Sequence, residues 1–342
     1  MKAVVIKEIK PITEEGEPVE YTEVPDPEPG DREIIIGVSA CGVCHTELDE
    51  IEGRSLPPVL PVIPGHQVVG RVVAIGKGVS RHRIGDRVGV GWIYSACGRC
   101  AYCLTGRENL CPEFIATGRD RHGGYAEFMK VPEDFAFPIP EGISDIHAAP
   151  LMCAGAIGYR SLKLSNIKDG ENLGLTGFGA SAHLVLQAVR HLFPGTKVYV
   201  FARSEGEREF ARQLGAIWAG DTTEEPPERL HAIIDTTPAW LPILMALRYL
   251  APGGRLVINA IRKEPGDRNC MAEIDYPRDL WMEKEIKSVA NVTRRDIEEF
   301  LQLAVSMHLT PEVQTYALRE AGQALKDLKA RKIRGAKVLK VV

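Results

Sequence analysis

The chain has 342 residues, of which 44% are hydrophobic and 26% are charged, and its formal net charge at pH 7 is −4. This length and composition indicate a soluble globular protein of about two domains, whose core needs no disulfide bonds. Charges of both signs are interspersed, which excludes a basic face for nucleic acid or a membrane. We expect a cytoplasmic protein, because residues 1–6 indicate a strand rather than a signal peptide and no apolar run reaches the roughly 18 residues of a membrane span.

The first part of the chain predicts short strands separated by irregular loops. Residues 33–38 form the clearest apolar run, and a second series of β-branched runs, punctuated by glycines, extends over residues 68–90. Loops such as Pro-Asp-Pro-Glu-Pro-Gly at residues 25–30 can continue neither a helix nor a central strand. We infer a compact, barrel-like β domain that carries the segments described next on its loops.

A thiol and an imidazole suited to zinc lie between these two strand series. Cys44 and His66 are two candidate ligands, and we place the third at Cys153, which follows a Pro-Leu-Met segment and opens an expected helix. A catalytic zinc site uses three protein ligands and keeps a fourth position open. Zinc-bound histidine commonly donates its other N–H to a carboxylate, so Glu47 is a candidate partner for His66. The alternative for Glu47 is a solvated surface side chain.

Four of the eight cysteines lie close together, at Cys97, Cys100, Cys103 and Cys111. Four thiolates at this spacing can close a tetrahedron around zinc with no open position, which is typical of a structural site. The alternative is a loop with free or disulfide-paired cysteines, although clustered thiols in a reducing cytosol are more often metal ligands.

From residue 171 the pattern changes to alternating strands and helices. The expected strands cover residues 172–176, 197–202, 232–235 and 255–259, and the expected helices run through residues 183–189 and 207–214. This alternation predicts a parallel, doubly wound sheet. After about residue 292 we expect a helix over residues 296–308 and a final strand over residues 337–342.

A glycine-rich turn connects the first of these strands to the first helix. Gly177 permits a tight turn, and Gly179 and Ala180 let a pyrophosphate approach the helix N-terminus, where unpaired N–H groups favour anions. Ala182 stands where a third glycine is usual, and alanine is tolerated there. We therefore predict a dinucleotide site at this turn.

The end of the second strand bears on the choice between NAD and NADP. A carboxylate there binds the ribose hydroxyls of NAD, but the window holds Ala202, Arg203 and Ser204. A guanidinium and a hydroxyl are donors suited to a 2′-phosphate, which favours NADP. The alternative is a solvated Arg203, with Glu205 or Glu207 reaching the ribose of NAD.

Taken in order, these segments resemble the zinc-dependent medium-chain alcohol dehydrogenase family over essentially the whole chain. The resemblance also includes Gly-Asp-Arg-Val at residues 85–88 and Gly-Gly-Tyr-Ala-Glu at residues 123–127. It implies an α/β protein with a GroES-like catalytic domain and a Rossmann cofactor domain. The expected parts are residues 1–154 with a structural zinc lobe at about 94–113, the Rossmann domain at 155–291, and a C-terminal return to the catalytic domain at 292–342.

The resemblance implies hydride transfer between a nicotinamide cofactor and a zinc-bound primary or small secondary alcohol, in a homo-oligomer of two or four chains. Two zinc ions per chain are implied, one catalytic and one in the lobe. Thr46 matches the hydroxyl that takes the alcohol proton, and His45 matches a contact to the cofactor pyrophosphate. Trp92 matches a position that lines the substrate pocket, although tryptophan is also a good core residue.

The chain departs from the family pattern at two positions. Gln67 stands where the family usually has a glutamate that can approach the zinc, and Asp49 stands where many relatives have a relay histidine. Activity is still expected, with an altered rate and pH profile. The alternatives are a polyol or sugar dehydrogenase of the same fold, or a zinc-binding, redox-sensing relative without turnover.

Overall fold

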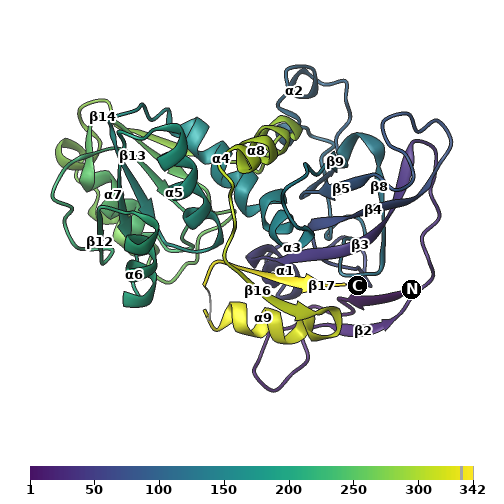
Figure 1. The fold of residues 1–342 in the computed structure, drawn as a ribbon. Helices are drawn as coiled ribbons and strands as arrows, with labels where there is room; N and C mark the ends of the chain where they lie inside the picture. The colour runs from purple at the N-terminus through teal and green to yellow at the C-terminus, as the bar shows by residue number, and fades with distance from the viewer. Residues whose placement is uncertain (332–333, 342) are drawn as a thin grey trace. The chain divides into compact units, whose positions relative to one another are not determined.

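The computed structural model describes residues 1–331 and 334–341, and the chain divides into two compact units (Figure 1). Unit 1 consists of Met1–Ala156 and Val292–Val342, and unit 2 consists of Ile157–Asn291. The sequence predicts these boundaries at residues 154 and 291. Unit 2 is thus an insertion between the two segments that form unit 1.

A seven-stranded sheet forms the centre of unit 1, in the order β16-β17-β3-β4-β5-β9, with β8 also paired to β3. Its strands are β3 (Glu33–Val43), β4 (Gln67–Ile75), β5 (Arg87–Val90), β8 (Phe128–Pro132), β9 (Phe137–Pro138), β16 (Val313–Ala317) and β17 (Ala336–Lys340). The long, almost fully buried β3 pairs with β4, β8 and β17, and is therefore the core strand. Two further sheets pair β1 (Lys2–Val5) with β2 (Glu20–Glu23), and β6 (Ile93–Ser95) with β7 (Ile115–Ala116).

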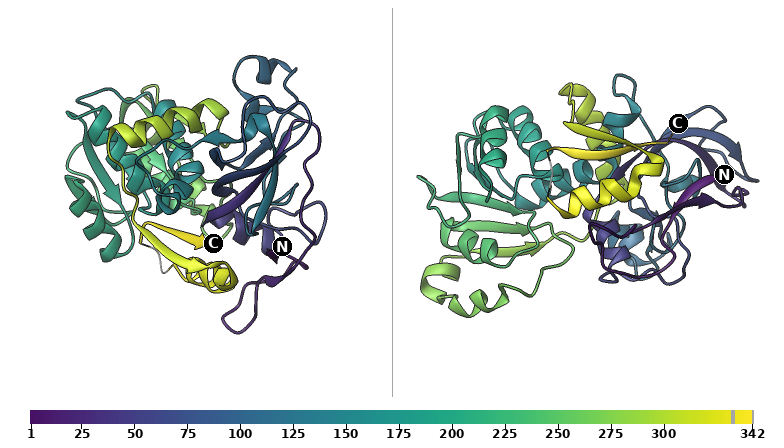
Figure 2. Two further views of the ribbon diagram at one scale, coloured as in Figure 1. Left: turned by 45° about the vertical axis from the view of Figure 1, so that its right-hand side comes forward. Right: turned by 90° about the horizontal axis from the view of Figure 1, so that it is seen from below.

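The C-terminal segment returns to this sheet. β17 runs antiparallel to β3, with Leu339 opposite Cys41, and carries β16 at its other side (Figure 2). The predicted final strand extended to Val342, which lies outside the described residues. The helices are α1 (His45–Ile51), α2 (Ala101–Leu104), α3 (Asp145–Ala148), α8 (Arg294–Ser306) and α9 (Ala321–Lys329), while α4 (Ala154–Ser165) begins in unit 1 and continues into unit 2.

Unit 2 contains a six-stranded parallel sheet in the order β12-β11-β10-β13-β14-β15. Its strands are β10 (Asn172–Thr176), β11 (Lys197–Phe201), β12 (Trp218–Gly220), β13 (Leu230–Asp235), β14 (Leu250–Ile258) and β15 (Glu285–Ser288), and its connecting helices are α5 (Ala180–Leu192), α6 (Glu205–Leu214) and α7 (Leu241–Tyr249). The strand order reverses at β10, so right-handed connections place helices on both faces of the sheet (Figure 1). The predicted doubly wound parallel sheet is confirmed.

No helix in residues 1–331 or 334–341 combines the length and the apolar character needed to cross a bilayer.

Candidate active site

Three chain segments of unit 1 bring Cys44, His66 and Cys153 together. Their ligand atoms all lie within 4.8 Å of one another, and His66 Nε2 is 3.2 Å from Cys153 Sγ. The pairing of β3 with β4 explains part of this arrangement. Gly42 lies opposite Gln67, so Cys44 leaves β3 at the same end at which His66 enters β4. Cys153 comes from the turn that precedes α4.

Gly65 fixes the backbone immediately before His66. Its φ is +96°, in the left-handed region that favours glycine, and a Cβ at this position would lie 2.2 Å from the Tyr125 ring. Tyr125 is fully buried, so its ring cannot move aside without disturbing the core. The entry of His66 into the site therefore depends on the absence of a side chain at Gly65.

Glu47 orients His66 from the first turn of α1. Its Oε1 lies 2.7 Å from His66 Nδ1, and its Oε2 accepts a hydrogen bond of 2.7 Å from the backbone N–H of Cys44. Both side chains are buried, so the structure places Glu47 in the site rather than on a solvated surface. With Nδ1 facing the carboxylate, Nε2 faces Cys153 and is the nitrogen available to a metal.

The close contact of these three side chains shifts their pKa values in different directions. A hydrogen bond from Cys153 and the neighbouring His66 hold the pKa of Cys44 well below its usual value, while that hydrogen bond and burial raise the pKa of Cys153. Burial would lower the pKa of His66, but Glu47 and Cys44 together raise it well above its ordinary value. Of these shifts, only that of Cys44 favours the metal-binding form, a thiolate, and the S₂N donor set of the three residues fits a zinc ion with one open position.

The four-cysteine lobe forms a second candidate metal site. The sulfur atoms of Cys97, Cys100, Cys103 and Cys111 all lie within 4.8 Å of one another. Backbone N–H groups point at them: Cys100 N donates to Cys97 Sγ at 3.4 Å, and Cys97 N donates to Cys111 Sγ at 3.4 Å. Such donors, from Arg99 and Cys100, lower the pKa of Cys97 to about 6. All eight cysteines are described and free, so no disulfide competes with a closed tetrahedral site.

The other residues predicted near the metal differ in their surroundings. Thr46 is half-buried, with Oγ1 3.6 Å from Cys44 Sγ, whereas the neighbouring His45 is exposed. Asp49 is buried and accepts a hydrogen bond of 2.7 Å from Arg54 Nε. Asp49 is therefore held by a cation, a contact that the sequence did not reveal.

Trp92 is half-buried within a small aromatic and cationic cluster. Its ring centroid lies 5.1 Å from that of Phe114, and the Arg119 guanidinium lies 5.6 Å above it. Gln67 is buried, and its side chain lies over Gly42, where a Cβ would come within 2.7 Å of it.

The glycine-rich turn of unit 2 has the geometry of an open helix N-terminus. Gly177 has φ +77°, and a Cβ there would lie 2.9 Å from Thr236 Oγ1. Gly179 is the extended residue that precedes α5, and a Cβ on it would meet no atom within 4 Å. This turn leaves the N–H groups at the start of α5, beginning with that of Ala180, accessible to an anion.

A buried cluster next to this turn escaped the sequence analysis. Asp235, at the end of β13, accepts hydrogen bonds from Thr176 at 2.5 Å and from Thr237 at 2.8 Å. Lys263 forms a buried ion pair with the same carboxylate. Only the topology brings these residues together, because β10 and β13 are neighbours in the sheet but lie far apart in the chain.

The end of β11, where a ligand could bind, combines one buried residue with two exposed polar residues. Ala202 is buried, while Arg203 and Ser204 are exposed. Ser204 begins α6: its hydroxyl accepts from Glu207 N at 3.2 Å and donates to Glu207 Oε2 at 2.7 Å. Arg208 donates to the Ala202 carbonyl at 2.8 Å. Ser204 therefore already serves as a helix cap.

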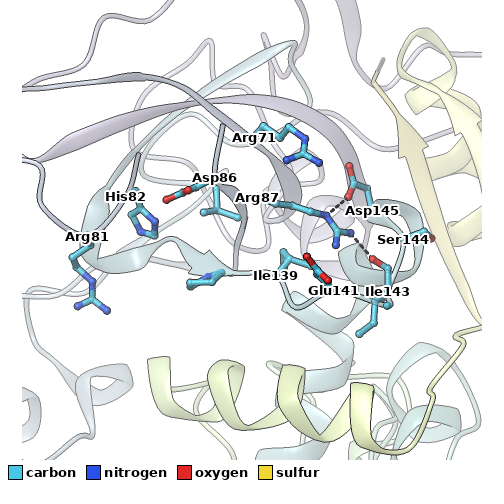
Figure 3. Close-up of a pocket in the computed structure, with 13 residues that line it drawn as sticks. Arg71, Arg81, His82, Asp86, Arg87, Ile139, Glu141, Ile143, Ser144 and Asp145 are labelled. Carbon is cyan, nitrogen blue, oxygen red and sulfur yellow. Dashed lines mark hydrogen bonds and ion pairs between the residues drawn. The ribbon is translucent and has the colours of Figure 1, made fainter. Parts of the chain in front are cut away.

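A separate polar cavity of about 680 Å³ lies in unit 1 (Figure 3). Arg87 lies at one end of it, where its Nε donates to Asp145 Oδ1 at 2.6 Å and a terminal nitrogen donates to the Ile143 carbonyl at 2.6 Å. No predicted site residue lines this cavity. Arg87 holds the chain around α3 through these two hydrogen bonds, which indicates a structural role for this end of the cavity.

Comparisons with known proteins agree with these features. Residues 30–141 match the model of the alcohol dehydrogenase GroES-like domain. The chain is 41% identical to the probable alcohol dehydrogenase AdhA of Mycobacterium tuberculosis, over 94% of this chain and 92% of that one. A solved NAD-dependent alcohol dehydrogenase is similar with a TM-score of 0.84 and 26% identity over 100% of both chains. CAD from Helicobacter pylori, solved with NADP(H), is similar with a TM-score of 0.86 and 22% identity. The similarity covers 99% of this chain and 97% of that one.

Proposed function

Because the chain belongs to the zinc-type medium-chain alcohol dehydrogenase family and is an alcohol dehydrogenase, we propose that Cys44, His66 and Cys153 hold its catalytic zinc. The proposed reaction is reversible hydride transfer between a primary or small secondary alcohol and a nicotinamide cofactor. The observation that carries this proposal is the convergence of the three ligand atoms within 4.8 Å, with Glu47 on the far nitrogen of His66.

Residues around the ligands would accept the proton that the alcohol loses and pass it on. When bound, zinc supplies a Lewis acid that lowers the pKa of a hydroxyl in the open position. Thr46 would accept that proton, because its half-buried hydroxyl lies beside Cys44. Asp49 is the proposed next member of the relay, and its contact with Arg54 would hold its carboxylate in one position. Trp92 would narrow the substrate pocket and favour small or slender alcohols.

We assign the four-cysteine lobe a second, structural zinc. The N–H···S hydrogen bonds to Cys97 and Cys111 support this, because backbone donors stabilise thiolates and leave the sulfur atoms facing one another. A site with four thiolates has no position for substrate. Its contribution would be to the stability of the lobe rather than to the reaction.

For the cofactor we favour NADP(H) over NAD(H). The pyrophosphate would bind at the Gly177–Gly179 turn and Ala180. The exposed Arg203 at the end of β11 supports a 2′-phosphate contact, and no carboxylate stands at Ala202. The alternative is NAD(H), since similar folds carry each cofactor and Ser204 is engaged as a cap.

We also propose that the chain forms a homo-oligomer through the β15 edge of unit 2. All residues of β15 are exposed, including Ile286, and the nearby Trp281 and Met282 are more than half exposed. An exposed edge strand beside apolar side chains favours pairing with another chain. Sedimentation of Ile286→Lys should yield monomer, and an unchanged oligomer would contradict this interface.

Zinc content and a substrate panel test the proposed function. The purified protein should contain two zinc ions per chain and should reduce NADP in the presence of primary alcohols. Faster turnover with polyols or sugars would instead indicate a polyol dehydrogenase of the same fold. Two zinc ions without turnover of any alcohol would indicate a redox-sensing relative.

A further inference from the structure

Glu50 is a buried carboxylate that the roles assigned above leave unused. It lies near the end of α1 with no exposed surface, and neither carboxylate oxygen has a hydrogen-bond partner in the described part of the chain. A carboxyl group buried in this way is strongly destabilising when charged unless a cation or several donors compensate for it, and it leaves polar atoms unsatisfied when neutral. Its persistence in the core of unit 1 therefore calls for a partner.

Glu50 lies on the side of α1 that faces the metal ligands. It follows Glu47 by three residues, so the two side chains project from one face of the helix, and Glu47 contacts His66. Burial raises the pKa of Glu50 well above its ordinary value; the charge of Glu47 raises it further, and His66 lowers it. Glu50 thus lies within electrostatic range of the candidate zinc ligands.

The neighbouring protein groups do not pair with Glu50. Arg119 attracts the carboxylate, but its guanidinium is bound to both oxygens of Asp120 at 2.8 Å and lies over the Trp92 ring. Glu47 repels it. The partner that this environment lacks is a cation on the side of Cys44 and His66.

We propose that Glu50 is an exchangeable fourth ligand of the zinc held by Cys44, His66 and Cys153. This inference rests on the proposed zinc centre. The Glu50 oxygens are not among the atoms that lie within 4.8 Å of one another, so the side chain must swing toward the metal to bind it. A carboxylate oxygen then donates a lone pair to zinc as water or product leaves, with no change in oxidation state. Glu50 would thereby supply the mobile carboxylate that the amide of Gln67 cannot supply.

Zinc retention and the visible spectrum of the cobalt(II)-substituted protein test this proposal. Glu50→Gln keeps the shape of the side chain but removes its charge. It should lose the catalytic metal to a chelator at about 10 to 100 times lower chelator concentration, and its cobalt spectrum without substrate should change. Glu52→Gln is the matched control, because Glu52, two positions further on, contacts Arg54, Lys329 and the Ile12 N–H instead. This control should retain metal as the wild type does.

The outcomes separate this inference from the zinc centre itself. A folded Glu50→Gln variant with unchanged zinc affinity and cobalt spectrum would overturn the role of Glu50 alone. A wild-type protein with one zinc per chain, insensitive to Cys153→Ala, would overturn the catalytic centre. If Glu50→Gln does not fold, a crystal structure of the zinc-loaded wild type tests whether Glu50 binds the zinc. A Glu50 oxygen should lie about 2.0 to 2.2 Å from zinc without substrate, and a carboxylate remote from zinc with and without substrate would refute the proposal.

Discussion

Glu47 Oε1 lies 2.7 Å from His66 Nδ1, and neither side chain is exposed by more than 1%. Burial raises the pKa of Glu47, while the charge and hydrogen bond of His66 lower it. The carboxylate is also held by the backbone N–H of Cys44, so one side chain connects two candidate zinc ligands. Its position on α1 therefore fixes the orientation of the imidazole relative to the thiols.

Replacing Glu47 with glutamine should weaken zinc binding at Cys44, His66 and Cys153. The amide cannot accept the His66 N–H and the Cys44 N–H with the strength of a carboxylate, and loss of such a partner costs about 10- to 100-fold in metal affinity or activity. Zinc content during dialysis against a chelator measures the effect. Asp145→Asn, which removes a carboxylate paired with Arg87 in the same unit, should retain both metals. Equal retention in the two variants would contradict the orienting role of Glu47.

The sequence predicted the elements that carry a strong local signal. β10 was expected at residues 172–176 and has those bounds, because a short run of buried residues ends at a glycine with positive φ. The parallel sheet followed from the alternation of strands and helices, but only four of its six strands were expected, and β12 and β15 were not. α5 begins at Ala180 rather than near residue 183, because the extended Gly179 already ends the turn.

Features that depend on contacts between distant segments of the chain, or on burial, were not predicted. α1 is short and follows a strand directly, so its polar sequence His-Thr-Glu-Leu-Asp-Glu-Ile gave no helical period, although five of its seven residues are buried. The sequence therefore carried no signal that Glu50 is buried. The ion pair between Lys263 and Asp235 also left no signal, because it joins segments that only the parallel sheet brings together.

Cys153→Ala and His66→Ala should each remove the catalytic zinc and abolish turnover. The remaining two donors cannot hold the ion as three do, whereas the lobe cysteines share no residue with this site. The zinc content should fall from two ions to one per chain, and the circular dichroism spectrum should show that the fold is retained. Cys270→Ser, which lies outside both clusters, is the control. Full activity in Cys153→Ala would show that the third ligand lies elsewhere.

Cys103→Ser should reduce stability more than chemistry. Zinc in a closed site of four thiolates contributes directly to folding, so loss of one thiolate should lower the thermal midpoint by several degrees. Calorimetry of the variant, with Cys270→Ser as the matched thiol control, measures the change. An unchanged midpoint together with low turnover would reverse the roles proposed for the two metals.

The choice of cofactor can be tested at the end of β11. Ser204 is a poor probe, because its hydroxyl caps α6 and its removal would cost about 1 kcal/mol of helix stability. Arg203 is exposed, so its truncation tests the contact without disturbing the cap. A charge-assisted hydrogen bond contributes about 1.5 to 3 kcal/mol, so Arg203→Ala should raise the KM for NADPH roughly tenfold to a hundredfold and leave the KM for NADH nearly unchanged.

Ala202→Asp should go further and invert the preference. A carboxylate at this position would repel the 2′-phosphate and would offer two acceptors to the ribose hydroxyls of NAD. Arg208 donates to the backbone carbonyl of Ala202, so the strand end should keep its shape in the variant. Initial rates with NADPH and NADH, measured for the wild type and the two variants, show which cofactor each protein prefers. A wild type that prefers NADH, together with a silent Arg203→Ala, would show that Arg203 is a solvated residue at the end of β11.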